Sequence, residues 1–120
     1  MKPYQAKIHY NRVQSAILDV TAGPFELTID PSYVHNFVGV VFYSDADGET
    51  VVQPTAGTVN FKVKLVVQPH LWQDLPDNAI DASIADQTDW SGNTEVVQWS
   101  IAGLAGAATH CRLIVAGNSS

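Results

Sequence analysis

The residues of this chain that are suited to metal binding or proton transfer near neutral pH are few and widely spaced. None of the histidines is placed relative to a Cys, a second His or a carboxylate as a zinc site requires. The four histidines are His9, His35, His70 and His110. We expect the first and last of them on outward strand positions and the other two in loops. The sequence therefore predicts no metal site and no cofactor.

Nucleophile chemistry is equally hard to place. Cys111 is the only cysteine, so the chain cannot form an internal disulfide. Leu113 and Val115 follow it at strand spacing, which predicts a small buried thiol in the core and not a nucleophile. The sequence contains no Gly-x-Ser-x-Gly motif, no phosphate-binding glycine loop and no dinucleotide fingerprint. We therefore expect a protein that is not an enzyme.

Carboxylates concentrate in the second half of the chain, where no Lys or Arg lies between Lys64 and Arg112. The acidic residues in that interval are Asp74, Asp77, Asp81, Asp86, Asp89 and Glu95. Any acidic loop region offers pairs of this kind, so the spacing identifies no general acid and base. Two interpretations stay open: a solvated region that aids solubility, and a docking surface for a basic partner.

The segment Asp45-Ala-Asp-Gly48 resembles a fragment of a calcium-binding loop. Its glycine comes two positions too early for an EF-hand, and the later bidentate Glu is missing. A tight hairpin turn is the better interpretation, although a few converging loop oxygens would suffice for a calcium site in a β-domain.

Aromatic side chains are the best candidates for contact with a partner. Trp99 follows the inward alternation of its segment, which predicts core packing. Trp90 lies in an Asp-Trp-Ser-Gly sequence typical of a turn, so we expect it to be the most exposed tryptophan. An exposed Trp can stack on a sugar or anchor a protein interface. The candidate interface residues, drawn from aromatic and acidic loop positions, are Tyr33, Trp72, Trp90, Asp86 and Asp89.

Alternating apolar and polar residues identify the elements that must position these side chains. From Thr58 to Val67 every second residue is apolar, which predicts a strand with one buried face. The segment 37–43 is apolar at nearly every position, which predicts a central strand covered on both faces. The other expected strands are 4–12, 16–20, 25–29, 50–53, 96–101 and 109–116, with 70–75 and 78–83 less regular. We expect turns at 86–93 and a small-residue connector at 102–108.

The chain is expected to be all-β, a single antiparallel β-sandwich of about eight strands, either immunoglobulin-like or jelly-roll. Its 120 residues suffice for one domain, which we place at 1–117, with 118–120 as a loose tail. Turn signals recur at the spacing of a sandwich or barrel, and no segment has helical periodicity.

Charge and hydropathy exclude several partners. The net charge of −6 and the scattered basic residues argue against nucleic acid. No apolar stretch is long enough to span a bilayer, so we expect no membrane contact. The N-terminus lacks the apolar run of a signal peptide, which predicts synthesis and folding in a cytoplasm.

The second half of the chain resembles small β-sandwich virion proteins of tailed bacteriophages. The resemblance covers about residues 56–118 and ends in a glycine- and alanine-rich connector before a last strand. An extra Ala108 precedes Thr109, and Cys111 stands where an aromatic residue is usual. The segments that carry the resemblance are Ala56–Val59, Trp72, Leu75-Pro76, Asn78–Ala82, Trp90–Gly92, Val96–Trp99 and Gly103–Asn118.

The resemblance implies a structural role in the virion. It favours a capsid decoration protein that binds the major capsid protein as a homo-oligomer, with a head-fibre, tail or baseplate component as the closest variant. An edge strand such as 4–12 could extend a neighbour's sheet. The alternative from another class is a carbohydrate-binding or adhesin-like module that uses Trp90, Tyr33 or Trp72.

Overall fold

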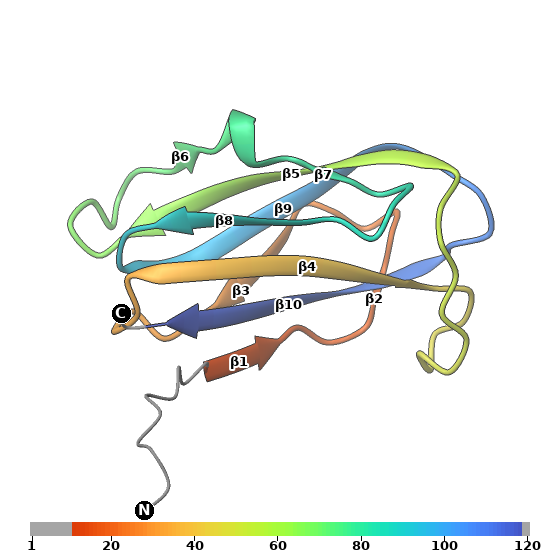
Figure 1. Cartoon of the computed structure of the whole chain (residues 1–120), viewed down its shortest axis with the longest axis horizontal. Coiled ribbons are helices and arrows are strands. Elements are labelled where there is room, and N and C mark those ends of the chain that lie inside the picture. Colours follow the sequence, from red (N-terminus) through yellow and green to blue (C-terminus); the bar gives the residue numbers. More distant parts are fainter. Residues whose placement is uncertain (1–10, 119–120) are drawn as a thin grey trace, which may run out of the picture.

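The computed structural model describes residues 11–118, which form an antiparallel β-sandwich of ten strands and one 3-10 turn (Figure 1). The predicted all-β sandwich is confirmed. The structure has two strands more than the eight that we expected, and three of its ten strands are only two residues long. The elements are β1 (Asn11–Gln14), β2 (Leu18–Asp19), β3 (Phe25–Thr28), β4 (His35–Tyr43), β5 (Ala56–Leu65), β6 (Gln73–Asp74), η1 (Pro76–Asn78), β7 (Ile80–Asp81), β8 (Gln87–Ser91), β9 (Thr94–Ala105) and β10 (His110–Asn118).

The strands form two sheets. Sheet A has the order β1-β10-β4-β8, with β2 also paired to β10. Sheet B has the order β3-β9-β5-β6, with β7 also paired to β5. Every pairing is antiparallel. In Figure 1 sheet A lies in front and sheet B behind it. All four long strands are therefore interior strands, and short strands form the edges of both sheets.

Every second side chain along the strands of both sheets points inward and fills the core. On β5 the inward residues Val59, Phe61 and Val63 are almost fully buried, as the alternation predicts. Trp99 on β9 is fully buried against Phe25, with ring centroids 5.2 Å apart. Tilted aromatic pairs of this kind contribute beyond their buried area. The predicted core position of Trp99 is confirmed.

We expected a turn at 86–93 because the segment is rich in Asp, Ser, Gly and Asn. This prediction is wrong. Residues 87–91 form β8, which pairs with β4 from His35 to Gly39. Asn78 at the end of η1 supports this strand, since its side-chain amide donates to the Asp89 carbonyl and to Thr88 Oγ1. Backbone pairing with β4 outweighs the local turn preference of the sequence.

Other boundaries also differ from the expectation. β9 continues through most of the predicted connector and ends at Ala105. Asn118, which we assigned to a loose tail, belongs to β10 and pairs with His35 while 7% exposed. The expected strand at 50–53 is reduced to one bridge between Tyr43 and Val51. Most of the expected strand at 4–12 lies outside the described residues.

Candidate functional site: the outer face of sheet A

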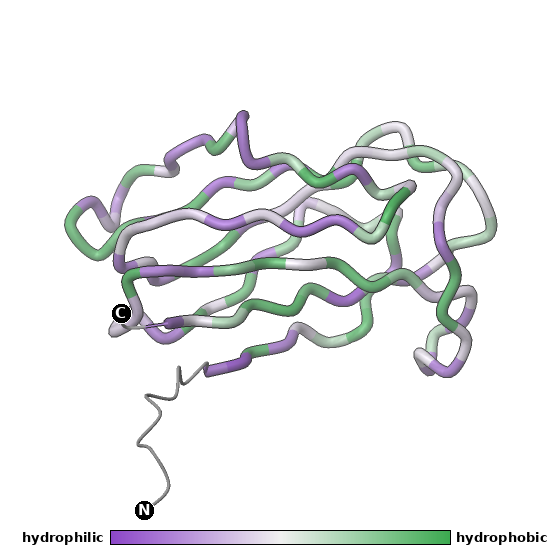
Figure 2. The backbone as a smooth tube through the Cα atoms, viewed as in Figure 1, coloured by the Kyte–Doolittle hydropathy of each residue, from purple (hydrophilic) through white to green (hydrophobic). Residues whose placement is uncertain are grey.

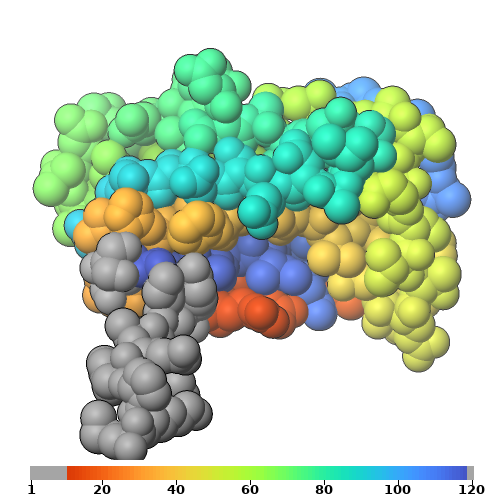
Figure 3. Space-filling model, viewed as in Figure 1, coloured from red at the N-terminus to blue at the C-terminus, as the bar shows by residue number. Residues whose placement is uncertain are grey.

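The outer face of sheet A consists of the side chains of β1, β10, β4 and β8 that point away from the core. Their strand neighbours Val38, Leu113 and Val115 are buried, so alternation places the remaining side chains on the opposite surface. Figure 3 views the molecule from this side, and Figure 2 shows that β4 and β10 are apolar along much of their length. The residues of this face are Arg12, Gln14, Phe37, Gly39, Val41, Gln87, Asp89, Arg112, Ile114 and Ala116.

Strand register aligns these residues in rows across the sheet. One row runs Arg12, Ala116, Phe37, Asp89 over β1, β10, β4 and β8. The next row runs Gln14, Ile114, Gly39, Gln87 over the same strands. Each row is therefore apolar in the middle and polar at both ends. The first row carries a cation at one end and a carboxylate at the other.

A groove of about 700 Å³ lies on this face. Its floor includes Phe37, Gly39 and Ile114, and Val51 and Ile84 line it from two loops. Gly39 leaves open space, because no heavy atom lies within 4 Å of the position that a Cβ would take. Val51 and Ile84 are 67% and 56% exposed and line the same groove.

One glutamine joins the two loops that border the groove. Gln53 Nε2 donates hydrogen bonds to the carbonyls of Ala82, at 2.6 Å, and Ile84, at 3.1 Å. The loop that carries Val51 is therefore hydrogen-bonded to the loop that carries Ile84. Both hydrogen bonds span about thirty positions of sequence, so no local pattern predicts them.

The outer face of sheet B has the opposite character. Asn60 and Lys62 on β5, and Gln98 and Ser100 on β9, alternate with buried residues and face solvent. Lys62 Nζ lies 3.6 Å from Asp74 Oδ1 in an exposed ion pair, which contributes little to stability. One sheet thus presents an ordinary solvated surface, whereas the other presents apolar side chains.

The segment 37–43 is a central strand, but it is not covered on both faces within residues 11–118. Phe37, Gly39 and Val41 are half-buried on the outer face, and no further sheet or helix of the described chain lies over them (Figure 1). Strands that read as continuous apolar runs are usually buried on both sides. Within residues 11–118, β4 is therefore packed against a second sheet on its inner side only.

The expected exposure of Trp90 is wrong. Trp90 is 6% exposed on the inner side of β8, and its Nε1 donates a 2.9 Å hydrogen bond to Thr94 Oγ1. Thr94 is itself fully buried. The indole is thus a satisfied part of the core and is not available as an interface anchor or sugar platform.

The other four predicted interface residues do not form one site, and only Asp86 and Asp89 lie on the same side of the molecule. Asp89 is exposed on the outer face of sheet A, and the carboxylate of Asp86 accepts from the backbone N–H of Asp81. Tyr33 is half-buried and packs on Gly117 of β10. Trp72 is also half-buried, with Lys64 Nζ 4.6 Å from its ring centroid. The structure brings only Asp86 and Asp89 near the groove, at its β8 side.

Sequence reasoning missed the residues that define this face, above all Gly39, Ile114, Ala116 and Arg12. The available signal was that β4 and β10 carry apolar residues at both odd and even positions, and therefore on both sides of the strand. For residues 37–43 we interpreted it as a strand covered on both faces, and for the last strand we noted only the inward side. No motif marks these positions, because their common property appears only when four strands are aligned.

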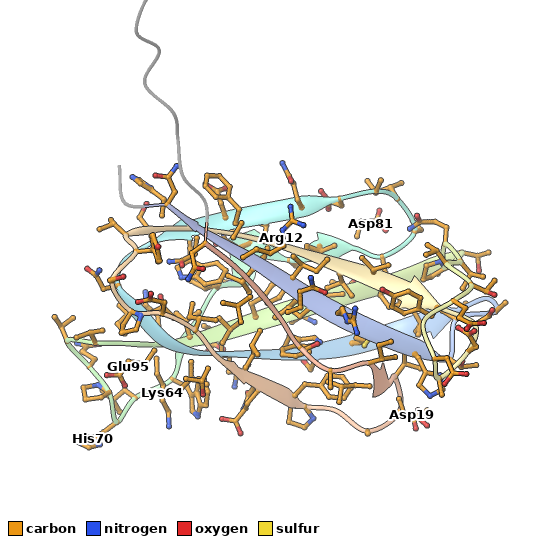
Figure 4. The ribbon with its side chains drawn as sticks, turned by 90° about the horizontal axis from the view of Figure 1, so that it is seen from below. Arg12, Asp19, Lys64, His70, Asp81 and Glu95 are labelled. Carbon is orange, nitrogen blue, oxygen red and sulfur yellow. The ribbon has the colours of Figure 1, made fainter. Side chains whose placement is uncertain are left out.

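The carboxylates are engaged in local turns. Asp19, Asp30 and Asp81 each accept from the backbone N–H and the hydroxyl of the residue two positions later. These hydrogen bonds lower the pKa of each carboxyl below its ordinary value. Figure 4 shows Asp19, Asp81 and Glu95 at separate places on the periphery. In the described part of the chain, no three His, Cys, Asp or Glu side chains gather as metal ligands would.

Asp45 forms the expected hairpin turn. Its carboxylate accepts from the backbone N–H groups of Glu49 and Thr50, and the Ser44 N–H donates to the Thr50 carbonyl. The same oxygens that a calcium ion would need are thus used to close the turn.

Cys111 is fully buried between the sheets, as the sequence predicts. Burial raises the pKa of its thiol to about 11, and the indole N–H of Trp99 opposes this shift in part. The Trp99 Nε1 has no hydrogen-bond acceptor with standard geometry, so its contact with sulfur is a weak one. A thiol in this state is a poor nucleophile at neutral pH.

Fold and site together define a small two-sheet sandwich with one apolar outer surface. The chain belongs to the DUF7265 family, a domain of unknown function, whose profile matches residues 8–120. No curated protein matches the sequence. Among solved structures, the fold is similar to that of the SPBc2 prophage-derived protein YomS. The TM-score is 0.50 at 8% identity, over 95% of this chain and 100% of that one.

No helix among residues 11–118 combines the length and the hydropathy that a membrane crossing needs.

Proposed function

We propose that this chain is a non-catalytic structural protein of a tailed-phage virion, specifically a capsid decoration protein that works as an oligomer on the shell. The observation that carries the proposal is the apolar outer face of sheet A. Phe37, Val41 and Ile114 on this face are half-buried, and Val51 and Ile84 beside them are exposed. Apolar side chains grouped in this way are typical of a surface that contacts other subunits. The resemblance of residues 56–118 to virion β-sandwich proteins supports the proposal, as does the fold shared with a prophage-derived protein.

The mechanism is adhesive. Many copies each bury apolar area between themselves and neighbouring subunits, and the shell gains resistance to internal pressure. An interface that buries ~1,600 Å² in total suffices for specific attachment. The partner is the major capsid protein or another virion protein. The net charge of −6 makes packaged nucleic acid an unfavourable partner. The protein would be made in the host cytoplasm and end in the virion.

Purified virions test this proposal. Mass spectrometry of particles separated into heads and tails should detect the chain in the head fraction, at a copy number comparable with that of the major capsid protein. Shells that lack the chain should bind added protein on a sucrose gradient, and binding should raise their melting temperature. Detection in tails alone would favour the tail or baseplate variant. Absence from every virion fraction, together with no binding to shells, would contradict the proposal.

For the carbohydrate-binding alternative, Trp90 is excluded because it is buried in the core. Trp72 and Tyr33 remain as candidates, and both are half-buried. Binding on a glycan array that Trp72→Ala abolishes, in a variant that keeps its melting temperature, would support this alternative against the structural role.

A further inference from the structure

We propose that a polar groove on the outer face of sheet B binds a neutral saccharide, through side-chain amides, a hydroxyl group and an ion pair. The groove has a volume of about 340 Å³, which is within the usual range for small-molecule sites and leaves room for one hexose unit. We call it the sheet B groove. It lies on the sheet opposite to the surface that carries the proposed function, so the inference goes beyond that function and does not depend on it.

The floor of the sheet B groove consists of four polar side chains, which alternate with core residues and therefore point outward. They are Asn60 and Lys62 on β5 and Gln98 and Ser100 on β9. The strand register pairs Asn60 with Ser100, and Lys62 with Gln98. Directly opposed residues lie ~5 Å apart, and successive outward residues of one strand lie ~7 Å apart. The four groups therefore span an area comparable with that of one pyranose ring and its hydroxyl groups.

Three of these side chains are not used in the fold. Within residues 11–118, the side chains of Asn60, Gln98 and Ser100 form no hydrogen bond. Gln98 and Ser100 are half-buried, yet their polar atoms remain open to solvent. Several amides elsewhere donate to backbone carbonyls and connect segments of the fold, namely those of Asn36, Gln53, Asn78 and Asn93. The amides of the sheet B groove, in contrast, are free to bind a ligand.

The segment 74–76 forms one wall of the sheet B groove and is fixed at both of its ends. Asp74 Oδ1 lies 3.6 Å from Lys62 Nζ, and the Leu75 N–H donates a 3.1 Å hydrogen bond to the Phe61 carbonyl. Pro76 begins η1, and its ring restricts the backbone there. β6 and η1 follow one another beside β5 (Figure 1). Leu75 and Pro76 thus give the groove a rigid apolar edge against which the C–H groups of a sugar can pack.

The chemistry of the sheet B groove selects a neutral ligand. A side-chain amide offers two donors and an acceptor, and a hydroxyl group both donates and accepts, as do the hydroxyl groups of a sugar. The ammonium group of Lys62 is paired with Asp74, so the groove carries no net charge and does not favour a phosphate or another anion. A few polar groups beside an apolar edge are the usual composition of a small-molecule site.

This site differs from the aromatic platform of the carbohydrate-binding alternative. Trp72 does not line the sheet B groove. Lys64 Nζ lies 4.6 Å from the centroid of its ring, so one face of the indole is already in contact with a cation. The saccharide is therefore expected to bind through the amides of Asn60 and Gln98 and not on the indole.

An NMR titration of the isotope-labelled full chain tests the inference directly. The probes are glucose, galactose and mannose, each beside its own uronic acid, and tetraglycine as a peptide backbone. At least one neutral sugar should shift the side-chain amide signals of Asn60 and Gln98, while the engaged amides of Asn36 and Asn93 stay in place. The corresponding uronic acid should bind no more tightly than the neutral sugar.

Three results of the titration would overturn the inference. The first is that no neutral sugar moves the Asn60 and Gln98 signals. The second is a response to tetraglycine alone, which would assign the groove to an extended peptide. The third is tighter binding of the uronic acid, which would show that Lys62 holds an anion.

Variants locate the sugar. Asn60→Ala and Gln98→Ala should each weaken binding about tenfold, since each removes hydrogen bonds to the ligand. Their melting temperatures should not change, because neither amide is used in the fold. Gln73→Ala is the matched control, since Gln73 precedes Asp74 and lies outside the groove, and it should bind as the wild type does. Trp72→Ala should also retain binding.

Binding that is lost in Trp72→Ala and kept in Gln98→Ala would place the sugar on the indole and overturn the assignment. Equal losses in Gln98→Ala and Gln73→Ala would overturn it as well. Capsid binding is measured separately on the sucrose gradient, so a failure of sugar binding is distinguishable from a failure of the proposed function.

Discussion

The ring of Tyr33 occupies the space in which a side chain at Gly117 would lie. A Cβ on Gly117 would come within 2.8 Å of Tyr33 Cγ and 2.9 Å of Tyr33 Cβ, closer than real Cβ atoms approach other heavy atoms. Gly117 sits at an inward position of β10, so the loop before β4 closes this end of the sandwich with an aromatic ring. Tyr33, which we considered as an interface anchor, is thus committed in part to the protein's own packing.

Gly117→Ala is expected to destabilise the fold by about 1–3 kcal/mol, because the added methyl group must displace Tyr33 together with its loop. Urea denaturation of dilute protein measures the change. Gly39→Ala is the matched control on a neighbouring strand of the same sheet, where open space receives the methyl group, and its effect should stay within about 0.5 kcal/mol. Equal losses in the two variants would contradict the packing of Tyr33 on Gly117.

Thr94→Val should cost about 1–3 kcal/mol of stability, since it keeps the shape of the side chain and leaves the buried Trp90 Nε1–H without its oxygen acceptor. Thr94→Ser retains the hydroxyl and should recover most of the loss. Denaturation curves followed by tryptophan fluorescence measure both variants. A neutral Thr94→Val would show that the Trp90–Thr94 hydrogen bond is unimportant.

Alkaline pH should destabilise the protein through Cys111. Its pKa is raised from 9.0 to about 11 in the fold, so between these values the unfolded thiol is ionised while the folded thiol keeps its proton. This contribution is complete below pH 9 and is lost as pH rises toward 11. Melting temperatures across this range should fall less steeply for Cys111→Ala than for the wild type. In the native state, the thiol should also react with iodoacetamide far more slowly than in urea.

Asp19, Asp30 and Asp81 should titrate below 3.8 in an NMR pH titration, because their carboxylates accept hydrogen bonds that protonation removes. A lowered folded-state pKa means that the associated stability is present above 3.8 and is lost as pH falls through the folded value. Ser83→Ala removes the strongest cause of the shift at Asp81 and should raise that midpoint alone. If Asp30 moved as well, the shift would not be local.

The sequence predicts the fold well wherever one face of a strand is buried. On β5, alternation between Val59 and Val63 locates both the strand and its inward face. On β8, Thr88 and Trp90 alternate inward in the same way, but Asp89, Ser91 and Gly92 suggest a turn. Pairing with β4 decides the conformation there, and the partner of a strand lies too far away in sequence to enter a local pattern.

The candidate site was harder to predict because it is a property of the aligned sheet. Exposed acidic and aromatic residues attract attention in a sequence, yet Trp90 proved to be buried. Gly39 and Ile114 attract none, since each is unremarkable until register places them side by side. The apolar residues on the outer side of β4 carried the available signal, but the sequence alone does not show what contacts them.

The placement of the four long strands has a consequence for edge-to-edge aggregation. Within residues 11–118, β4, β5, β9 and β10 all lie inside their sheets, and the strands at the edges are no longer than five residues. Short edge strands offer another molecule few free backbone groups, which disfavours edge-to-edge aggregation. Contacts with neighbouring molecules are therefore expected to depend on side chains, which can be selective, more than on backbone pairing.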